Sequence, residues 1–443
     1  MNHHLCALAR TAKRVVLGAA LAALLLSGCN RRQEPTPTPA ATAAQGAIAA
    51  AAATRSGAPA AAETPTPAPS PTPLSGSVVL WHSWAQADAD ALAAILAQMQ
   101  TQLPGVTVET LFVAPADLLP AYADAVAAGG GPDLVIAPNW WLNDLVQAAA
   151  VAPLDALVDP AALEGYWPAT LDSLRVQGAL YGLPVNYHLV ALYVNQSLLP
   201  AGGVATTTDA LLEQARLSPQ SGAGLYATLF HLYGWLPAFG AQLFDDTGRV
   251  TLDQSGGAAD YLAWLATVNN TPGSYVDADY GMLLDRFKKG EFAYLVDGPW
   301  SLRELREALG DNLAVATLPA GPAGPARPWL YADGLFFNAK LDETRRPLVL
   351  AVGQALTSAQ SGTILAQTAG LLPAARAAEL GGDPLLAAFA AQAADASALP
   401  TGPEMAEVWA YGGDMLLKAL TGVAPPPAIV AETTALINEA NGK

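Results

Sequence analysis

The segment 285–300, with the sequence DRFKKGEFAYLVDGPW, would bring a large aromatic ring to a place where α/β proteins often bind ligands. Apolar residues at helical spacing end at 288–290, Lys-Lys-Gly, which is typical of a basic helix terminus capped by glycine. Residues 292–296 have the pattern of a short strand, and 297–299 form a turn. Trp300 would therefore follow the carboxyl end of a strand, where it could stack on a ligand or fill the core.

The preceding part of the chain alternates between predicted strands and helices. Strand patterns cover 77–81, 106–112 and 133–137, and helix patterns cover 92–103 and 117–128, the latter closed by the glycines 129–131. This order predicts an α/β fold with a mainly parallel sheet and right-handed crossovers. The residues after the first and third strands are further candidate ligand contacts: Trp81, His82, Ser83 and Trp84, then Asn139, Trp140 and Trp141.

The N-terminus has the features of an export signal. Arg10, Lys13 and Arg14 precede an apolar run at 15–26 that is too short to span a bilayer. The run ends in Leu-Ser-Gly-Cys at 26–29, which resembles the bacterial lipobox, although an ordinary secretory signal with a chance cysteine has the same outline. We expect residues 1–28 to be removed and Cys29 to carry the lipid anchor, since two or more acyl chains hold a protein stably.

The composition of the remaining chain limits its domain organisation and its possible partners. Residues 29–75 are rich in Pro, Ala and Thr and predict an extended linker after the lipidated cysteine. Residues 76–443 are long enough for two domains. The only other cysteine, Cys6, lies in the signal, so we expect no disulfide in the exported domain. The net charge of -17 argues against a nucleic-acid partner.

The chain lacks the common catalytic and nucleotide-binding motifs GxSxG, HExxH and the P-loop. His82, His188 and His231 would remain after export, and their spacing matches no metal site. A glycosidase needs two carboxyl groups about 5 to 9 Å apart, and the strand ends offer no such pair. We therefore expect a binding protein and no enzyme, with no cofactor and no metal.

Aromatic residues at strand ends suit a sugar ligand. A pyranose has apolar C–H faces that lie well on indole rings, while its hydroxyl groups need donors and acceptors around the rim. The chain has 10 tryptophans, several of them at predicted strand ends. A neutral sugar would also need no compensating ion.

Six short segments in order resemble the sugar-binding branch of the extracellular solute-binding proteins of ABC transporters. They are SVVLWHSW at 77–84, GGGPDLV at 129–135, GALYGLP at 178–184, LYVN at 192–195, FKKGEFAYLVDGPW at 287–300 and PEMAEVW at 403–409. The resemblance implies a two-lobed, type II periplasmic-binding-protein fold with the ligand between the lobes. It implies one lobe at 76–187 and 334–380, the other at 188–333 and 381–443, and hinges near 186–190, Asp333 and 381–384.

The resemblance also implies which residues contact the sugar. Trp300 and Trp409 match the stacking aromatics of the family, with Trp84 and Trp141 next, while Trp81 fits the core better and Trp140 could do either. The implied polar rim and nearby rings are His82, Ser83, Asn139, His188, Tyr331, Asp333 and, from the second lobe, Trp235 or His231. Asp333 could equally be a hinge turn. Trp84, Ala85 and His188 depart from the pattern of maltose binders, so the identity of the sugar stays open.

By the same resemblance, the protein would be a monomer tethered by its lipid to the outer face of the cytoplasmic membrane. It would capture a sugar or oligosaccharide by hinge closure and deliver it to a membrane permease. Two alternatives stay open. The same fold could bind a polyamine or glycerol phosphate, or the chain could be a tethered carbohydrate hydrolase or an adhesion module.

Overall fold

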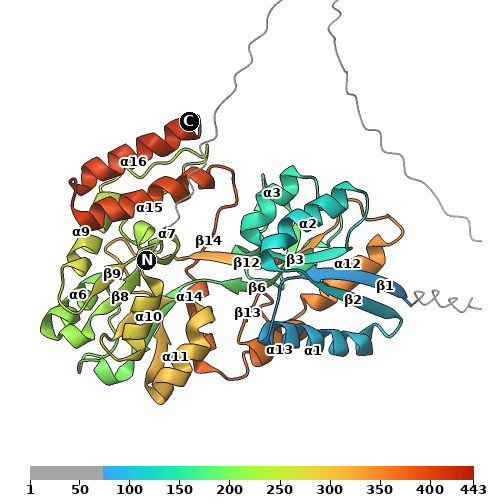
Figure 1. Cartoon of the computed structure of the whole chain (residues 1–443), viewed down its shortest axis with the longest axis horizontal. Helices are drawn as coiled ribbons and strands as arrows, with labels where there is room; N and C mark the ends of the chain where they lie inside the picture. The colour runs from blue at the N-terminus through green and yellow to red at the C-terminus, as the bar shows by residue number, and fades with distance from the viewer. Residues whose placement is uncertain (1–72) are drawn as a thin grey trace, which may run out of the picture. The chain divides into compact units, whose positions relative to one another are not determined.

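The computed structural model describes residues 73–443, which form two lobes, each built around its own β-sheet (Figure 1). The predicted signal peptide, the predicted lipid site at Cys29 and most of the predicted linker lie outside the described residues. The elements expected at 77–81, 92–103, 106–112, 117–128 and 133–137 are confirmed as β1, α1, β2, α2 and β3.

The first lobe contains a seven-stranded sheet in the order β13-β6-β12-β3-β1-β2, with β14 paired to β12. Its strands are β1 (Gly76–His82), β2 (Val106–Phe112), β3 (Leu134–Pro138), β6 (Gly182–His188), β12 (Trp329–Phe337), β13 (Leu372–Pro373) and β14 (Ser397–Ala398). β1 is parallel to β2 and β3, as the alternating pattern predicted. The sheet as a whole is mixed, because β12 runs back from the second lobe and lies antiparallel to β3 and β6.

The second lobe contains a five-stranded sheet in the order β11-β7-β10-β8-β9. Its strands are β7 (Ala191–Asn195), β8 (Ala223–Tyr226), β9 (Tyr275–Asp277), β10 (Tyr294–Asp297) and β11 (Leu313–Ala316). β10 is parallel to β8 and antiparallel to β7. β7 and β10 are buried along their whole length, as expected for central strands covered on both faces.

Helices cover both faces of the first sheet, with α2 and α3 on one side and α1 and α13 on the other in Figure 1. The helices of this lobe are α1 (Ala87–Gln102), α2 (Pro115–Ala127), α3 (Leu142–Gln147), α4 (Pro160–Leu163), α5 (Pro168–Asp172), α12 (Arg346–Leu356) and α13 (Ala359–Ala369). No single helix within 73–443 is long and apolar enough to cross a membrane; α12 and α13 reach that length only as a pair bent by 47°. A short hairpin joins β4 (Arg175–Val176) to β5 (Ala179–Leu180).

The helices of the second lobe include the last two of the chain, which pack on α9 and on each other. They are α6 (Thr208–Leu217), α7 (Leu229–Leu232), α8 (Trp235–Ala238), α9 (Gly257–Asn269), α10 (Tyr280–Lys288), α11 (Leu302–Leu309), α14 (Pro384–Ala393), α15 (Met405–Thr421) and α16 (Pro426–Ala440). Five 3-10 helices complete the described chain: η1 (Asn139–Trp141), η2 (Gln196–Leu198), η3 (Pro219–Ser221), η4 (Pro299–Ser301) and η5 (Gly310–Asn312).

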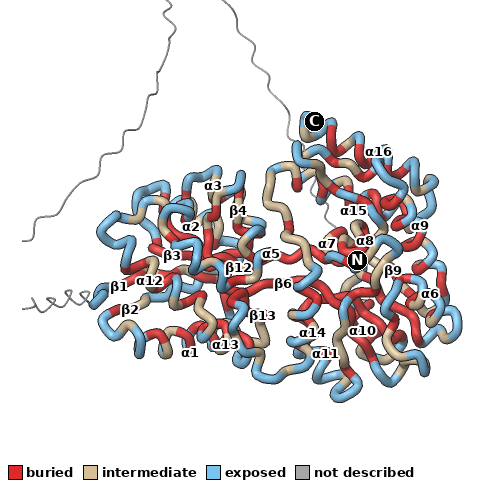
Figure 2. The backbone as a smooth tube through the Cα atoms, turned by 180° about the vertical axis from the view of Figure 1, so that it is seen from behind, coloured by how far each residue is buried: buried red, intermediate tan, exposed pale blue. Residues whose placement is uncertain are grey.

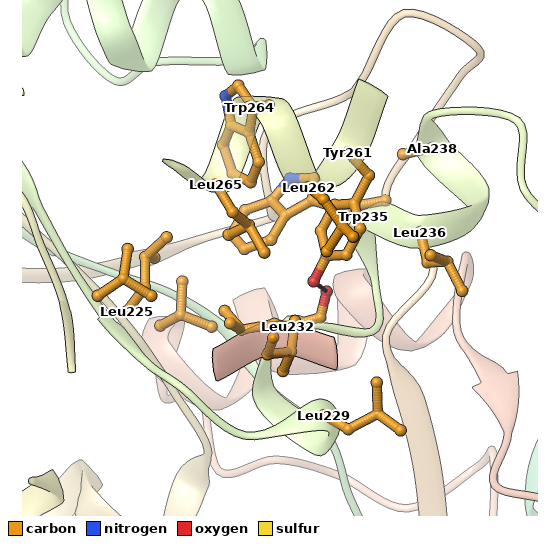
Figure 3. Packing of buried hydrophobic residues seen from close by; sticks show 14 of the residues in the cluster. Leu225, Leu229, Leu232, Trp235, Leu236, Ala238, Tyr261, Leu262, Trp264 and Leu265 are labelled. Atoms are coloured by element: carbon orange, nitrogen blue, oxygen red, sulfur yellow. Dashed lines mark hydrogen bonds between the residues drawn. The ribbon is translucent and has the colours of Figure 1, made fainter. Parts of the chain in front are cut away.

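Each lobe has its own apolar core, and buried positions concentrate on the central strands (Figure 2). Figure 3 shows part of the core of the second lobe, where Trp235 packs against Trp264 with ring centroids 4.9 Å apart. Trp235 is fully buried and its Nε1 donates a hydrogen bond to the carbonyl oxygen of Pro319 at 2.9 Å. The prediction that Trp235 approaches a ligand is therefore wrong, because helix α8 turns the indole into the core.

The chain passes from one sheet to the other twice within the described residues: β6 leads into β7 through residues 189–190, and β12 returns after β11. Residues 374–383 form a third connection between the lobes, from β13 to helix α14. β6 and β12 lie side by side in the middle of Figure 1. The pairing of β12 with β6 shifts register between Asp333 and Gly334. The carboxyl end of β6 pairs with the first half of β12, so side chains from these two segments lie at the junction of the lobes.

Candidate functional site

Two cavities adjoin each other where the lobes meet, and we call them together the interlobe cleft. The first has a volume of about 240 Å³ and is lined by Ser83, Trp84, Asp88, Pro115, Ile136, Ala137, Pro138, Trp140, Trp141, His188, Asp333 and Leu371. The second, of about 480 Å³, lies between the start of α1, the end of α13 and the turn that leads into α11. Asp88, His188 and Leu371 line both cavities, so the two cavities are direct neighbours.

The first lobe presents its tryptophans in the turn after β3. Asn139 is fully buried, and its Nδ2 donates to the carbonyl oxygens of Ser173 at 3.1 Å and Leu399 at 3.5 Å. These bonds tie the start of η1 to the surrounding chain. Trp140, the next residue, is 51% exposed, whereas Trp141 is half-buried against the core of the lobe. Both indoles line the first cavity.

The second lobe presents Trp300 in the turn after β10, as the sequence predicted. Gly298 precedes Pro299 at the first position of η4, where the missing N–H of proline is no loss. Trp300 follows at the second position, is 42% exposed and lines the second cavity. Its ring lies 6.4 Å from that of His188. The turn therefore presents an indole to the cleft from the second lobe, as the turn after β3 does from the first.

A polar group of three residues lies between the two turns. Asn186 Nδ2 donates to Asp333 Oδ2 at 3.0 Å and faces His188 Nε2 at 2.9 Å. Because an amide nitrogen is only a donor, Nε2 accepts and a neutral His188 holds its proton on Nδ1. That Nδ1 is buried and has no hydrogen-bond partner in the described part of the chain. The group thus offers an unpaired donor beside a carboxylate.

Tyr331 joins this polar group to the first turn. Its ring stacks on His188 with centroids 4.7 Å apart and meets Trp140 edge-on at 4.8 Å. Phe230 of α7 contacts both Tyr331, at 5.7 Å, and Trp300, at 6.2 Å. Rings from five separate segments therefore form one continuous series of contacts at the junction.

The end of β1 contributes mostly buried side chains. His82 is 6% exposed and meets Phe112 edge-on at 6.2 Å. Burial lowers the pKa of His82 below its ordinary value, opposed by a backbone hydrogen bond at Trp84. Trp84 belongs to the core of the lobe although one side of it lines the first cavity, and Ser83 lines the same cavity. The end of β1 therefore contributes packed side chains to the cavity wall, and the rings of His82 and Trp84 are not exposed there.

Trp409 lies apart from both cavities. It is 40% exposed on α15 and meets Trp329 edge-on at 5.2 Å. Trp329 stacks in turn on Tyr233 at 3.8 Å. Because Trp329 and Tyr331 alternate on β12 with one residue between them, their side chains leave the same face of the strand. Trp409 is therefore a half-exposed ring that packs on the buried Trp329, outside both cavities.

Several cleft residues escaped the sequence-based prediction. Asp88 lines both cavities from the first turn of α1. Burial raises the pKa of Asp88 above its ordinary value, the carboxylate of Asp333 adds to the rise, and His188 and Arg303 oppose it. A signal existed in the spacing, since Asp88 lies four residues after Trp84 and Arg303 lies three residues after Trp300. No local signal marks Gln367 and Thr368, which α13 brings to the second cavity.

His231 is buried beneath Trp300 and lines neither cavity. Its Nδ1 lies 2.8 Å from Thr228 Oγ1, and its Nε2 lies 3.4 Å from Asp297 Oδ1. The ring meets Trp300 edge-on at 5.9 Å. His231 therefore supports the indole from behind. No group of three or more His, Cys, Asp or Glu side chains suited to a metal ion occurs among residues 73–443.

Two α/β lobes, three connecting segments and an aromatic cleft at their junction define the architecture of a two-lobed binding protein of the type II class. Residues 94–401 match the model of the family described as "Bacterial extracellular solute-binding protein". The chain belongs to this family of binding proteins, which confirms the membership expected from the sequence motifs.

Named relatives and solved structures agree with this assignment. The chain is 25% identical over 349 residues to the maltotriose-binding protein of Pyrococcus abyssi, covering 76% of this chain and 75% of that protein. It is 24% identical over 341 residues to a maltooligosaccharide ABC transporter solute-binding lipoprotein of Streptococcus pneumoniae, covering 70% and 77%. A cyclo/maltodextrin-binding protein complexed with maltotetraose has the same fold, with a TM-score of 0.73 and 22% identity over 84% of this chain and 98% of that one.

Proposed function

We propose that the protein is the exported, substrate-binding component of an ABC importer and that it captures a maltooligosaccharide in the interlobe cleft. The observation that carries the proposal is the pair of half-exposed indoles, Trp140 and Trp300, which the two lobes direct to one cleft. The maltotriose-binding and maltooligosaccharide-binding relatives support the ligand class.

The cleft has the chemical character that a sugar requires. Indole rings receive the apolar faces of pyranoses, and polar atoms around them receive hydroxyl groups. Buried polar atoms normally have hydrogen-bond partners. In the described chain His188 Nδ1, Asn186 Oδ1 and Asn139 Oδ1 have none, and all three lie at or beside the cleft. Ligand hydroxyl groups would satisfy the two atoms on β6.

We assign the ligand contacts by their position in the cleft. Trp300 and Trp140 would stack on sugar rings, and Trp409 would extend the stack for a longer chain. The remaining proposed contacts in the first cavity are Trp141, Ser83, Asp88, His188 and Asp333, and Trp84 forms part of its wall. Tyr331 packs against the lining rings of Trp140 and His188, while the buried His82 and Asn139 line neither cavity. Arg303, Gln367 and Thr368 would bind hydroxyl groups in the second cavity.

Capture would proceed by hinge closure. Residues 76–187 and 334–380 form one lobe in this proposal, and residues 188–333 and 381–443 form the other. A ligand that contacts both lobes stabilises the closed state by its higher affinity for that state, and the permease would recognise the closed form. The protein would act as a monomer anchored through a lipid on Cys29, and the sugar would undergo no chemical change.

One observation favours a second candidate ligand, a polyamine. The lining of the first cavity contains two carboxylates, Asp88 and Asp333, several aromatic rings and no Lys or Arg. Carboxylates and rings together attract ammonium groups. The second cavity contains Arg303 and Arg306 beside Asp88 and Asp383, and Arg306 is paired with Asp383, so its lining offers a polycation no net attraction. An elongated polyamine would therefore fit only half of the cleft.

Isothermal titration of the full chain would test these assignments. The ligands would be maltotetraose, cellotetraose, spermidine and glycerol 3-phosphate, and each mixture would afterwards be analysed for cleavage products. We expect saturable binding of maltotetraose, weaker or no binding of the others, and no product. Release of shorter sugars would show that the protein is an enzyme. Tighter binding of spermidine than of maltotetraose would favour polyamine binding as the function.

A further inference from the structure

The indole of Trp300 is half-exposed, yet two neighbours define its orientation. We infer that Tyr280 and Gly298 are positioning residues that hold this ring ready for a ligand, an inference that rests on the proposed function of the cleft. Trp300 Nε1 donates a hydrogen bond to the hydroxyl oxygen of Tyr280 at 3.2 Å. Tyr280 begins α10 and lies 20 residues before Trp300 in the chain. The indole is thus fastened to another element.

The Tyr280 hydroxyl is itself held by a buried carboxylate. Asp297, with no exposed surface, accepts hydrogen bonds from the Tyr280 hydroxyl at 2.8 Å, Ser301 Oγ at 2.6 Å and the Gly298 N–H at 2.8 Å. Burial, with a contribution from Asp297, raises the pKa of Tyr280 to about 12. The hydroxyl therefore keeps its proton at neutral pH. Because the proton points to Asp297, the oxygen lone pairs remain free to accept from the indole.

Gly298 provides the space in which the ring lies. A Cβ atom at this position would fall 2.1 Å from Cζ3 and 2.2 Å from Cη2 of Trp300, far inside contact distance. The backbone there has φ -102° and ψ 180°, an extended conformation that any residue adopts. Glycine is therefore needed for the ring and not for the turn. The carbonyl oxygen of Gly298 accepts a hydrogen bond from the Tyr193 hydroxyl at 2.8 Å, which holds the backbone against which the indole packs.

The two constraints act on opposite parts of the indole. Tyr280 holds the pyrrole nitrogen, and Gly298 receives the six-membered ring. A ring that is already oriented loses less conformational freedom when a ligand stacks on it, so affinity rises without a new ligand contact. Tyr280 lines neither cavity and acts only through Trp300.

The test replaces Tyr280 by Phe, which keeps the ring and removes the hydroxyl. Tyr181→Phe is the matched control, because Tyr181 lies in the first lobe and its hydroxyl makes no hydrogen bond to another described residue. Both changes are combined with Trp300→Phe, which removes the indole N–H. The readouts are maltotetraose affinity by titration and the indole ¹H–¹⁵N resonance of Trp300 in the full chain, identified by its absence in Trp300→Phe.

We expect Tyr280→Phe to shift the Trp300 indole resonance and to weaken binding about 3- to 10-fold, the value of one net hydrogen bond. In the Trp300→Phe background the same change should weaken binding less than about 2-fold. An unshifted resonance, or an equal loss in both backgrounds, would overturn the inference. If wild type binds no sugar, the proposed function fails, and the resonance alone still decides whether Tyr280 positions the ring.

Discussion

The turn after β3 in the first lobe and the turn after β10 in the second have the same construction. In each, a fully buried strand ends, a 3-10 helix of three residues follows, and an α-helix begins at once with a buried leucine, Leu142 or Leu302. The second residue of each 3-10 helix is a tryptophan, Trp140 or Trp300. Both are exposed by about half and both line the interlobe cleft.

The two turns differ in how the ring is held. Trp300 has its nitrogen bonded to Tyr280 and its six-membered ring seated on Gly298. Trp140 contacts Tyr331 edge-on, and its nitrogen makes no hydrogen bond to any residue among 73–443. Local chain geometry is therefore enough to present an aromatic ring to the cleft. Holding the indole nitrogen takes a hydrogen-bond partner from another element, and of the two rings only Trp300 has one, in Tyr280.

Removing the restrained ring should have the largest effect. We expect Trp300→Ala to weaken maltotetraose binding about 30-fold, because well-packed aromatic anchors contribute about 2 kcal/mol or more. Titration calorimetry would measure the loss. Leu217→Ala, at a residue that is 77% exposed on α6, is the control and should leave affinity unchanged. An unchanged affinity in Trp300→Ala would remove the second turn from the site.

Displacing the same ring without deleting it should come next. Gly298→Ala forces the indole away from its seat, and we expect binding to fall about 10- to 30-fold. Gly413→Ala is the matched control, since a Cβ atom there meets nothing within 4 Å. Both variants would be compared by titration and by the indole resonance of Trp300. If Gly298→Ala and Gly413→Ala gave the same affinity and the same indole resonance, the space at Gly298 would not determine the orientation of Trp300.

Removing the less restrained ring should have a smaller effect. We expect Trp140→Ala to weaken binding about 3- to 10-fold, because part of its stacking energy is lost in ordering the ring. The measurement is the same titration, with the affinity ratio to Trp300→Ala as the result of interest. A larger loss for Trp140 than for Trp300 would reverse the comparison between the two turns.

The smallest effect concerns the stability of the first lobe in acid, where His82 lies at the end of β1. Burial lowers the pKa of His82 below 6.5, so the unfolded chain binds a proton first as the pH falls. The stabilisation present above pH 6.5 is therefore lost as the pH falls through the folded pKa. Thermal unfolding at pH 7.5 and 5.5 should show a larger drop in midpoint for wild type than for His82→Gln. Equal drops would contradict this origin of acid sensitivity.

Much of the fold could be predicted from local patterns. The five elements from β1 to β3 and the strand before Trp300 follow from apolar spacing and from glycine or proline at their ends. The mixed pairing of the first sheet could not, because β12 joins it from 190 residues further along the chain and its direction depends on the return from the second lobe. Trp235 was predicted near the ligand and lies in the core, since nothing in the local pattern shows which way helix α8 faces.

The sequence by itself determined the family and the presence of a tryptophan in the turns after β3 and β10, because strand, turn and helix start are specified by neighbouring residues. The tertiary structure decided which rings are held and which polar atoms stay unpaired. Asn186 and Asp333 are 147 residues apart, and Tyr280 reaches Trp300 from another helix. Such contacts depend on packing between distant segments, and no local pattern encodes them.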